Sequence, residues 1–169
     1  MKLPAVIWLT GLPASGKSTI AMGVYNYLLE NGNRVEHLDG DEVRAIFPQT
    51  GYSKDERDKH IRRVGYIAAL LEKHDVTVVA SFISPYREAR NFVRKLCRQF
   101  IEVYVSTPLE ICEKRDPKGL YKKARNGEII EFTGIDDPYE APLNAELTID
   151  TTNQTIGESV QIVINSITN

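Results

Sequence analysis

Hydrophobic positions along this chain follow two alternating patterns. Short segments of strand length and apolar character occur at residues 5–10, 34–39, 76–82, 100–106 and 146–151. Between them, apolar residues recur every three or four positions, most clearly over about 17–30, 54–73 and 87–98 and in a closing segment from Ile156 to Ile167. The first pattern is typical of strands buried within a sheet, and the second of helices that cover a sheet.

This alternation predicts the fold class. Repeated strand–helix–strand units indicate an α/β protein with a doubly wound, parallel five-stranded sheet and helices on both faces. We find no repeat, linker or low-complexity segment, so we expect residues 1–169 to form a single domain. Residues 115–143 break the alternation and are rich in charge, glycine and proline. Long irregular segments of compact domains commonly serve as active-site lids, and we expect a mobile lid here.

Composition narrows the class of protein. A chain of 169 residues, 42% hydrophobic and 26% charged, is typical of one globular domain that is neither disordered nor membrane-spanning. Its net charge of −2 argues against a strongly basic nucleic-acid binder. Cys97 and Cys112 each fall within a helical pattern, which favours reduced cysteines over a disulfide framework. With no signal-type segment at the N-terminus, these features predict a cytoplasmic protein.

The stretch GLPASGKST, directly after the first predicted strand, has the spacing of a phosphate-binding loop. Glycines at positions 11 and 16 let the backbone approach phosphate oxygens, while Lys17 supplies a cation and the Ser18 hydroxyl a ligand for Mg²⁺. A buried strand before the stretch and an amphipathic helix after it are the context that such a loop requires. We therefore expect a P-loop NTPase fold whose nucleotide-binding residues are Gly11, Leu12, Pro13, Ala14, Ser15, Gly16, Lys17, Ser18 and Thr19.

An acidic pair, Asp39 and Asp41, follows the second predicted strand. Because the carboxyl ends of parallel strands face the ligand crevice, this pair is expected beside the phosphate loop, and Asp41 is also a candidate helix N-cap. The N-K-x-D motif of GTPases is absent, and the strand at 76–82 does not end in the aspartate usual for motor ATPases. A kinase that acts on a small molecule is favoured.

Three stretches are candidates for the site of a second substrate. They are DGDEVR with Arg44, HIRR with His60, Arg62 and Arg63, and SFISPYR at the end of a predicted strand. The guanidinium group donates two parallel hydrogen bonds, which suits a phosphate or sulfate oxyanion. By contrast, we expect an exposed basic helix face from Arg87, Arg90, Arg94 and Arg98.

Four stretches resemble those of the adenylylsulfate kinase (APS kinase) family: GLPASGKST, LDGDEVR, SFISPYREAR and RDPKGLYKKARNGEIIEFTGIDDPYEAP. The resemblance covers nearly the whole chain, and the last stretch is its most specific part. It implies that MgATP phosphorylates the 3′-hydroxyl of adenosine 5′-phosphosulfate (APS), giving 3′-phosphoadenosine 5′-phosphosulfate (PAPS) in sulfate assimilation. It also implies a homodimer and functional coupling to ATP sulfurylase, with no nucleic-acid or membrane partner.

The resemblance assigns roles to individual positions. It implies that Asp41 positions the acceptor hydroxyl or takes its proton, and that Lys118 reaches the phosphates from the lid. Phe132 and the aromatic residue at position 52 would stack on the two faces of the APS adenine. The implied catalytic residues are Lys17, Asp41, Ser84 and Lys118, and the implied metal ligands are Ser18 and Asp41. The implied APS-binding residues are Asp41, Arg44, Tyr52, Arg57, His60, Arg63, Ile83, Ser84, Lys118 and Phe132.

The chain departs from the family pattern in three places. Tyr52 replaces the usual phenylalanine, which keeps the stacking surface and adds a hydroxyl. His60 replaces the usual asparagine before Ile-Arg-Arg, so the contact that this asparagine makes with APS needs another donor. The N-terminal extension of many members is missing from this sequence, and regulation through it is not expected.

Two alternative functions stay open at this point. One is a related kinase that phosphorylates a nucleoside monophosphate or a sugar acid, which the FTG…DDPYEAP stretch argues against. The other is a catalytically silent nucleotide-binding module associated with a sulfate-activating enzyme. Lys17, Asp41 and Lys118 are all present, which argues against the silent module.

Overall fold

The computed structural model describes residues 4–47 and 51–168. Its centre is a five-stranded sheet of order β2-β3-β1-β4-β5 in which every pairing is parallel. The strands are β1 (Val6–Gly11), β2 (Val35–Asp39), β3 (Thr77–Ser81), β4 (Phe100–Val105) and β5 (Leu147–Ile149). The helices are α1 (Lys17–Glu30), α2 (Gly40–Ile46), α3 (Lys54–Lys73), α4 (Arg87–Leu96), α5 (Leu109–Arg115), α6 (Leu120–Arg125) and α7 (Ile156–Thr168). The predicted fold class is confirmed.

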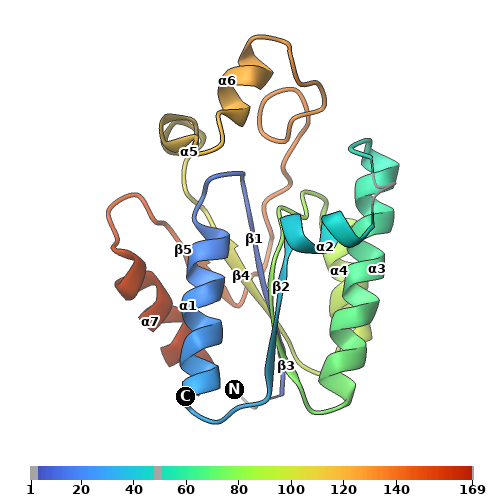
Figure 1. Cartoon of the computed structure of the whole chain (residues 1–169), viewed down its shortest axis with the longest axis vertical. Helices are drawn as coiled ribbons and strands as arrows, with labels where there is room; N and C mark the ends of the chain where they lie inside the picture. Colours follow the sequence, from blue (N-terminus) through green and yellow to red (C-terminus); the bar gives the residue numbers. More distant parts are fainter. Residues whose placement is uncertain (1–3, 48–50, 169) are drawn as a thin grey trace.

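Helices cover both faces of the sheet (Figure 1), α1 and α7 on one and α3 and α4 on the other. The side chains of the central strand β1 alternate accordingly. Ile7 and Leu9 pack in one core with α1 and α7, while Val6 and Trp8 pack in the other with α3 and α4. All four side chains are fully buried, which explains why this strand reads as a continuous apolar run.

The longest predicted helices agree closely with the structure. Helices α1 and α3 have the expected bounds, and α3 starts with a capping box in which Ser53 and Glu56 satisfy each other's backbone amides. Helix α4 ends at Leu96, so Cys97 is its C-cap residue instead of lying within it. Cys112 lies in α5 and is buried.

The expectation of an exposed basic face on α4 is wrong. Arg90 is only 2% exposed, and Arg94 pairs with Glu102 and Glu146. Arg87 is half-buried and donates to a backbone carbonyl at position 141, which leaves Arg98 as the exposed member of the four. The periodicity did not show this because the carboxylates and carbonyls that accept from these guanidinium groups lie 6 to 54 residues away in the sequence.

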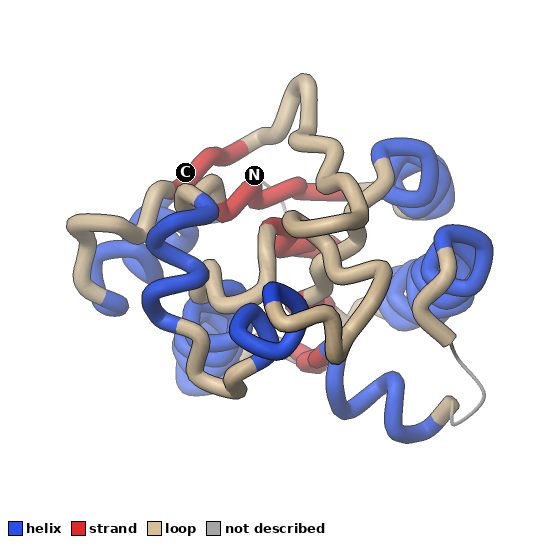
Figure 2. The backbone as a smooth tube through the Cα atoms, turned by 90° about the horizontal axis from the view of Figure 1, so that it is seen from above, coloured by secondary structure: helices blue, strands red, loops and turns tan. Residues whose placement is uncertain are grey.

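The segment predicted as an irregular lid lies across the carboxyl ends of the strands and above the sheet in Figure 1. In the view from above, it therefore lies in front of the strands (Figure 2). It is more ordered than expected, since it contains the short helix α6 and a bridge between Thr133 and Asp137. The chain termini lie at the opposite end of the molecule (Figure 1). None of the helices formed by the described residues has both the length and the apolar character that crossing a bilayer requires.

Candidate functional site

A cavity of about 670 Å³ opens at the carboxyl ends of β1, β2 and β3. Its size lies within the range of small-molecule sites, roughly 300–1,000 Å³. We define the phosphate loop as residues 11–19. At one end the cavity is lined by residues 13, 14 and 16–19 of this loop, together with Arg115, Thr151, Gln154 and Ile156. We call this the nucleotide end. At the other, which we call the acceptor end, it is lined by Arg44, Tyr52, Arg57, His60, Ile83, Ser84, Phe132 and Thr133.

The phosphate loop has the backbone that its sequence predicts. A Cβ atom on Gly11 would lie 2.4 Å from the carbonyl oxygen of Val105, so only glycine fits there. Gly16, with φ of 104°, adopts the left-handed conformation at the start of α1. No side chain caps α1, which leaves the amides of its first turn available to an anion.

Lys17 is held inside this loop. The residue is 8% exposed, and its Nζ donates to the carbonyl oxygen of Leu12 at 2.6 Å and to Ser15 Oγ at 3.4 Å. Burial lowers the pKa of Lys17 to about 8, against the opposing influence of nearby anionic groups such as Asp39. A triphosphate would supply the negative charge that this buried ammonium group lacks.

Asp39 is the carboxylate that meets the phosphate loop. It accepts hydrogen bonds from Ser18 Oγ at 2.8 Å, Ser81 Oγ at 2.9 Å and the backbone amide of Asp41 at 2.9 Å. Although partial burial opposes the shift, these three hydrogen bonds lower the pKa of Asp39 below its usual value. Asp41 was the candidate helix cap, and Asp41 and Ser18 were the implied metal ligands. In the structure Asp39 caps α2, and Asp39 is the acid in contact with Ser18.

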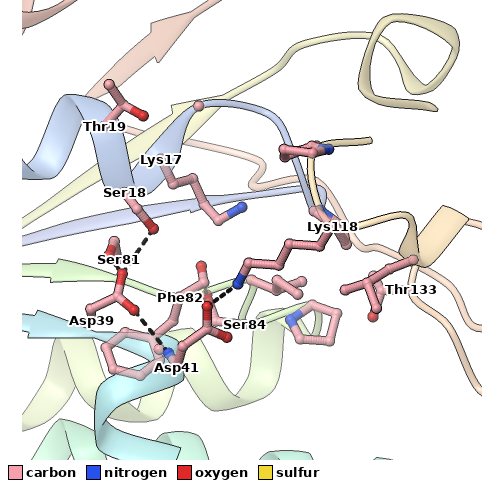
Figure 3. A pocket seen from close by; sticks show the side chains of 18 of the residues that line it. Lys17, Ser18, Thr19, Asp39, Asp41, Ser81, Phe82, Ser84, Lys118 and Thr133 are labelled. Carbon is pink, nitrogen blue, oxygen red and sulfur yellow. Dashed lines mark hydrogen bonds and ion pairs between the residues drawn. The ribbon is translucent and has the colours of Figure 1, made fainter. Parts of the chain in front are cut away.

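Asp41 instead forms an ion pair with Lys118 of the lid. Both side chains are mostly exposed, at 75% and 61% respectively. In Figure 3, Lys118 and Lys17 extend into the same space from opposite sides, with the carboxylate of Asp41 below them. The two lysines and the aspartate predicted as catalytic are therefore brought together at the middle of the cavity.

Tyr52 and Phe132 both line the acceptor end, as expected for two aromatic rings that bind one base. The guanidinium group of Arg44 lies 4.5 Å from the centre of the Tyr52 ring, and Phe132 packs edge-on against Tyr121 at 5.0 Å. Arg44 also donates to the backbone carbonyl of Gly51 at 2.9 Å.

Arg57 is engaged by the protein through all three of its nitrogens. They donate to the carbonyl oxygens of Tyr52 and Glu131 and to the hydroxyl of Thr133. The side chain is 9% exposed. Through these three hydrogen bonds it joins the segment that carries Tyr52 to the segment that carries Phe132. Arg57 was expected to hold the substrate or to line its site. It lines the cavity, and its contacts join the two aromatic segments.

His60 lies at the floor of the acceptor end between the rings of Phe47 and Phe82. The residue is 2% exposed, and no described residue offers either ring nitrogen a hydrogen bond. Burial, aided by the positive charges of Arg44 and Arg63, lowers the pKa of His60 to about 4, so the ring is neutral near pH 7. Arg63 itself is exposed and is not among the cavity-lining residues, so the structure does not bring it into the site as expected.

Ser84 lines the cavity, but its hydroxyl group is hydrogen-bonded to buried residues of the protein. Ser84 Oγ accepts from Trp8 Nε1 at 3.1 Å and donates to Thr10 Oγ1 at 3.0 Å. The residue is buried, and its backbone φ angle is 40°, a positive value that is unusual for residues other than glycine. The predicted site residue is thus in place, while its side chain belongs to a buried network that fixes the loop at residues 83–85.

The predicted lid divides into two parts. Residues 137–141, which we call the anchored segment, are hydrogen-bonded to the 83–90 region through Asp137 with Tyr86, and through Glu140 with Pro85 and Arg90. The part that carries Lys118 and α6 contacts the phosphate loop through the Tyr121 hydroxyl, which donates to the carbonyl of Pro13 at 3.0 Å. The expectation of a lid that is mobile over all of 115–143 does not fit the anchored segment.

Several residues of the nucleotide end escaped the sequence analysis. Arg115 donates to the hydroxyl and the carbonyl of Thr151, both at 2.7 Å, and Thr151 in turn donates to the carbonyl of Ser15 in the phosphate loop. Thr151 follows the last strand of the sheet, so the rule that ligands bind beyond strand carboxyl ends was the signal available. Nothing local in the sequence indicated the contacts of Arg115.

Comparisons with known proteins agree on one family. A family model described as adenylylsulphate kinase matches residues 3–150. A probable adenylyl-sulfate kinase of Pseudomonas aeruginosa is 52% identical over 160 residues, which covers 94% of this chain and 75% of the relative. The adenylyl-sulfate kinase of Microcystis aeruginosa is 51% identical over 163 residues, which covers 96% and 90%.

Solved structures give the same result. The APS kinase CysC of Mycobacterium tuberculosis in complex with AMPPNP and APS is 42% identical, with a TM-score of 0.93 over 98% of each chain. A gluconokinase of Sinorhizobium meliloti is similar in fold alone, at 16% identity and a TM-score of 0.64 over 98% of this chain and 93% of that one.

Proposed function

We propose the following function for this chain, which belongs to the adenylylsulfate kinase family: it transfers the γ-phosphoryl group of ATP to the 3′-hydroxyl of APS and releases PAPS and ADP. The observation that carries the proposal is one cavity in which a phosphate loop faces a second, aromatic and cationic site across Lys17, Lys118 and Asp41. A nucleotide-binding module without chemistry does not need the second site.

The nucleotide end fits ATP. The amides of the phosphate loop and of the first turn of α1 would bind its phosphates, and Lys17 would exchange the Leu12 carbonyl for the outer phosphates. The rest of the nucleotide would lie along Thr151, Gln154 and Ile156, where Arg115 is already fixed.

The acceptor end fits a nucleotide with two anionic groups. The adenine of APS would stack between Tyr52 and Phe132, each stacked face contributing about 1–3 kcal/mol. Arg44 lies at the same end for the phosphosulfate. The ring nitrogens of His60, which have no partner among the described residues, offer a donor and an acceptor to a polar group of the substrate.

Ser18 and Asp39 fit a magnesium ion. Magnesium binds oxygen ligands octahedrally at about 2.0–2.1 Å, which places neighbouring ligands about 2.9 Å apart, and these two oxygens are 2.8 Å apart. No cluster of three or more His, Cys, Asp or Glu side chains suited to a metal occurs among the described residues, which agrees with an ion held mainly by substrate phosphates. When bound, the ion neutralises charge on the phosphates.

The transfer step relies on positioning and charge neutralisation. A bond forms between the 3′-oxygen of APS and the γ-phosphorus, and the bond from that phosphorus to the β–γ bridging oxygen breaks. Asp41 orients the hydroxyl and accepts its proton, after Lys118 has exchanged the Asp41 carboxylate for the phosphates of ATP. Lys17 stabilises the charge that develops on the leaving ADP.

We also propose a homodimer with a cytoplasmic location and functional coupling to ATP sulfurylase. Family membership is what supports these statements. A solved neighbour from Thiobacillus denitrificans is described as a hexameric APS kinase; this chain spans 28% of it at 32% identity and a TM-score of 0.74. Light scattering on the purified protein would measure the subunit number.

The decisive experiment is a coupled assay for ADP release with MgATP and APS, beside AMP, gluconate and no acceptor. Turnover that depends on APS alone, with PAPS identified by mass, is the expected result. Turnover on AMP or gluconate would assign a different acceptor. ATP binding without turnover on any acceptor would favour the silent module.

A further inference from the structure

The guanidinium group of Arg90 lies beneath the acceptor end and bonds three separate segments. Nε donates to Glu102 Oε1 at 2.7 Å, Nη1 to the carbonyl oxygen of Ser84 at 2.6 Å, and Nη2 to the carbonyl oxygen of Glu140 at 2.6 Å. The side chain is 2% exposed. Each nitrogen of the fork therefore has its own acceptor, which only the planar geometry of arginine allows.

One of these acceptors belongs to a loop that lines the cavity, and a second belongs to the chain that follows the cavity-lining residues Phe132 and Thr133. Ser84 is part of the loop at 83–85 that lines the acceptor end, and Glu140 is part of the anchored segment that follows Phe132 and Thr133. The third acceptor, Glu102, is on β4, which pairs with the central strand β1. Arg90 thus fixes a cavity wall and the base of the lid to the sheet.

The loop at 83–85 requires such support. Ser84 has a positive φ, a conformation that costs about 1–3 kcal/mol and persists only where surrounding contacts impose it. Trp8 and Thr10 hold its hydroxyl, and Arg90 holds its carbonyl. The bond from Arg90 therefore supports the carbonyl end of this strained residue.

We propose that Arg90 is a positioning residue for the acceptor site, which acts through the carbonyl groups of Ser84 and Glu140. It sets the position of the 83–85 loop and of the anchored segment, and through them the affinity for the acceptor. The nucleotide end does not depend on it, because none of its three bonds reaches the phosphate loop. This inference rests on the proposed function for the identity of the acceptor.

The chain offers matched variants. Arg90→Lys keeps the charge beside Glu102, but one ammonium group cannot reach three acceptors arranged for a fork. Arg94 is on the same helix and pairs with the same Glu102, at 3.2 Å, as well as with Glu146. Within the described part of the chain, no hydrogen bond joins Arg94 to the 83–85 loop or to the anchored segment. Arg94→Lys is therefore the control, and Arg94 also keeps Glu102 paired when Arg90 is changed.

The test measures kcat and the KM of each substrate with MgATP and APS, the melting temperature, and calorimetric binding of AMPPNP and of APS. For Arg90→Lys we expect the KM and Kd for APS to rise about tenfold while the constants for ATP and AMPPNP stay within about twofold, since 1.4 kcal/mol corresponds to a factor of ten. For Arg94→Lys we expect all four constants to stay within about twofold.

Parallel weakening of both substrates, or unchanged APS constants, in Arg90→Lys would overturn the inference. If this variant does not fold, the double variant Arg90→Gln/Glu102→Gln replaces it, because it removes both charges together and leaves Arg94 paired with Glu146; the same selective loss is expected. If the wild-type protein neither binds nor phosphorylates APS, it is the proposed function that fails, whatever the variants do.

Discussion

The two ends of the cavity are constructed differently. The nucleotide end is centred on nine consecutive residues whose glycines, amides and lysine are in place because the loop joins β1 to α1. The acceptor end is assembled from segments that are far apart in the sequence. One hydrogen bond, from Arg57 to Thr133, joins residues 76 positions apart. A contiguous loop is specified by local sequence, while an assembled site depends on every buried contact that holds its parts together.

This difference predicts which variants act on one end and which on both. Changes within the phosphate loop should weaken nucleotide use directly. Substitutions of residues that support the acceptor end should displace the segments that line it. They should therefore weaken the binding of the acceptor and leave the binding of ATP nearly unchanged.

The largest effect is expected at the nucleotide end. Lys17→Ala removes the ammonium group that would bind the outer phosphates, and should lower kcat/KM for ATP at least about a hundredfold, roughly 2.7 kcal/mol of transition-state stabilisation. Steady-state kinetics with saturating APS measure it. Near-normal turnover would contradict the placement of the γ-phosphate at Lys17.

Lys118→Ala should affect the step that joins the two ends. Because the side chain is exposed and pairs with Asp41, its loss should leave the melting temperature unchanged while kcat falls about thirtyfold, roughly 2 kcal/mol in the activation barrier. Lys122→Ala, an exposed lysine of the same lid, is the matched control and should be near wild type. Equal losses in the two variants would mean that the lid acts through general positive charge.

The pH dependence of nucleotide binding should distinguish the ends further. The pKa of Lys17 is about 8 in the free protein, and the protonated form is the one that binds phosphate, so AMPPNP affinity should fall as pH rises above about 8, up to tenfold per unit. Calorimetric titrations between pH 7 and 9.5 would show this slope. Lys17→Arg, which does not titrate there, should lack it; an identical slope in this variant would assign the proton to another group.

Arg57→Lys should be selective for the acceptor. Lysine cannot bond the segments of Tyr52, Glu131 and Thr133 together, so the aromatic rings lose their fixed spacing and the KM for APS should rise about tenfold, with little change for ATP. Kinetics in both substrates measure the split. A larger rise in the KM for ATP than for APS would contradict it.

The smallest effect is expected from His60→Asn and concerns stability. The pKa of His60 is about 4 in the folded protein and 6.5 in its usual state. Between these pH values the unfolded chain binds a proton at His60 and the folded protein does not. The stability present above about pH 6.5 is therefore lost progressively as pH falls towards 4, by about 1 kcal/mol or more. Urea unfolding at a series of pH values should show a shallower decline in His60→Asn, and equal declines would show that His60 does not contribute.

Sequence patterns predicted the fold well where periodicity is long or burial is complete. The bounds of α1 and α3 and the five strands of the parallel sheet follow from local apolar spacing. The short helices α2, α5 and α6 were not delimited, because six or seven residues are too few to show a period. The roles that the resemblance gave to single residues remain proposals.

What the sequence determined by itself was the phosphate loop, since its chemistry resides in glycine conformations and in neighbours along the chain. Only the tertiary structure decided which polar side chains are hydrogen-bonded within the protein and which remain available to a ligand. Arg57 and Arg90 make internal connections. Of the acidic pair, Asp39 bonds Ser18 while Asp41 pairs with Lys118. His60 is buried with no partner among the described residues. The reason is physical: a buried polar group must find a partner, and the partner's distance along the chain leaves no trace in the local pattern.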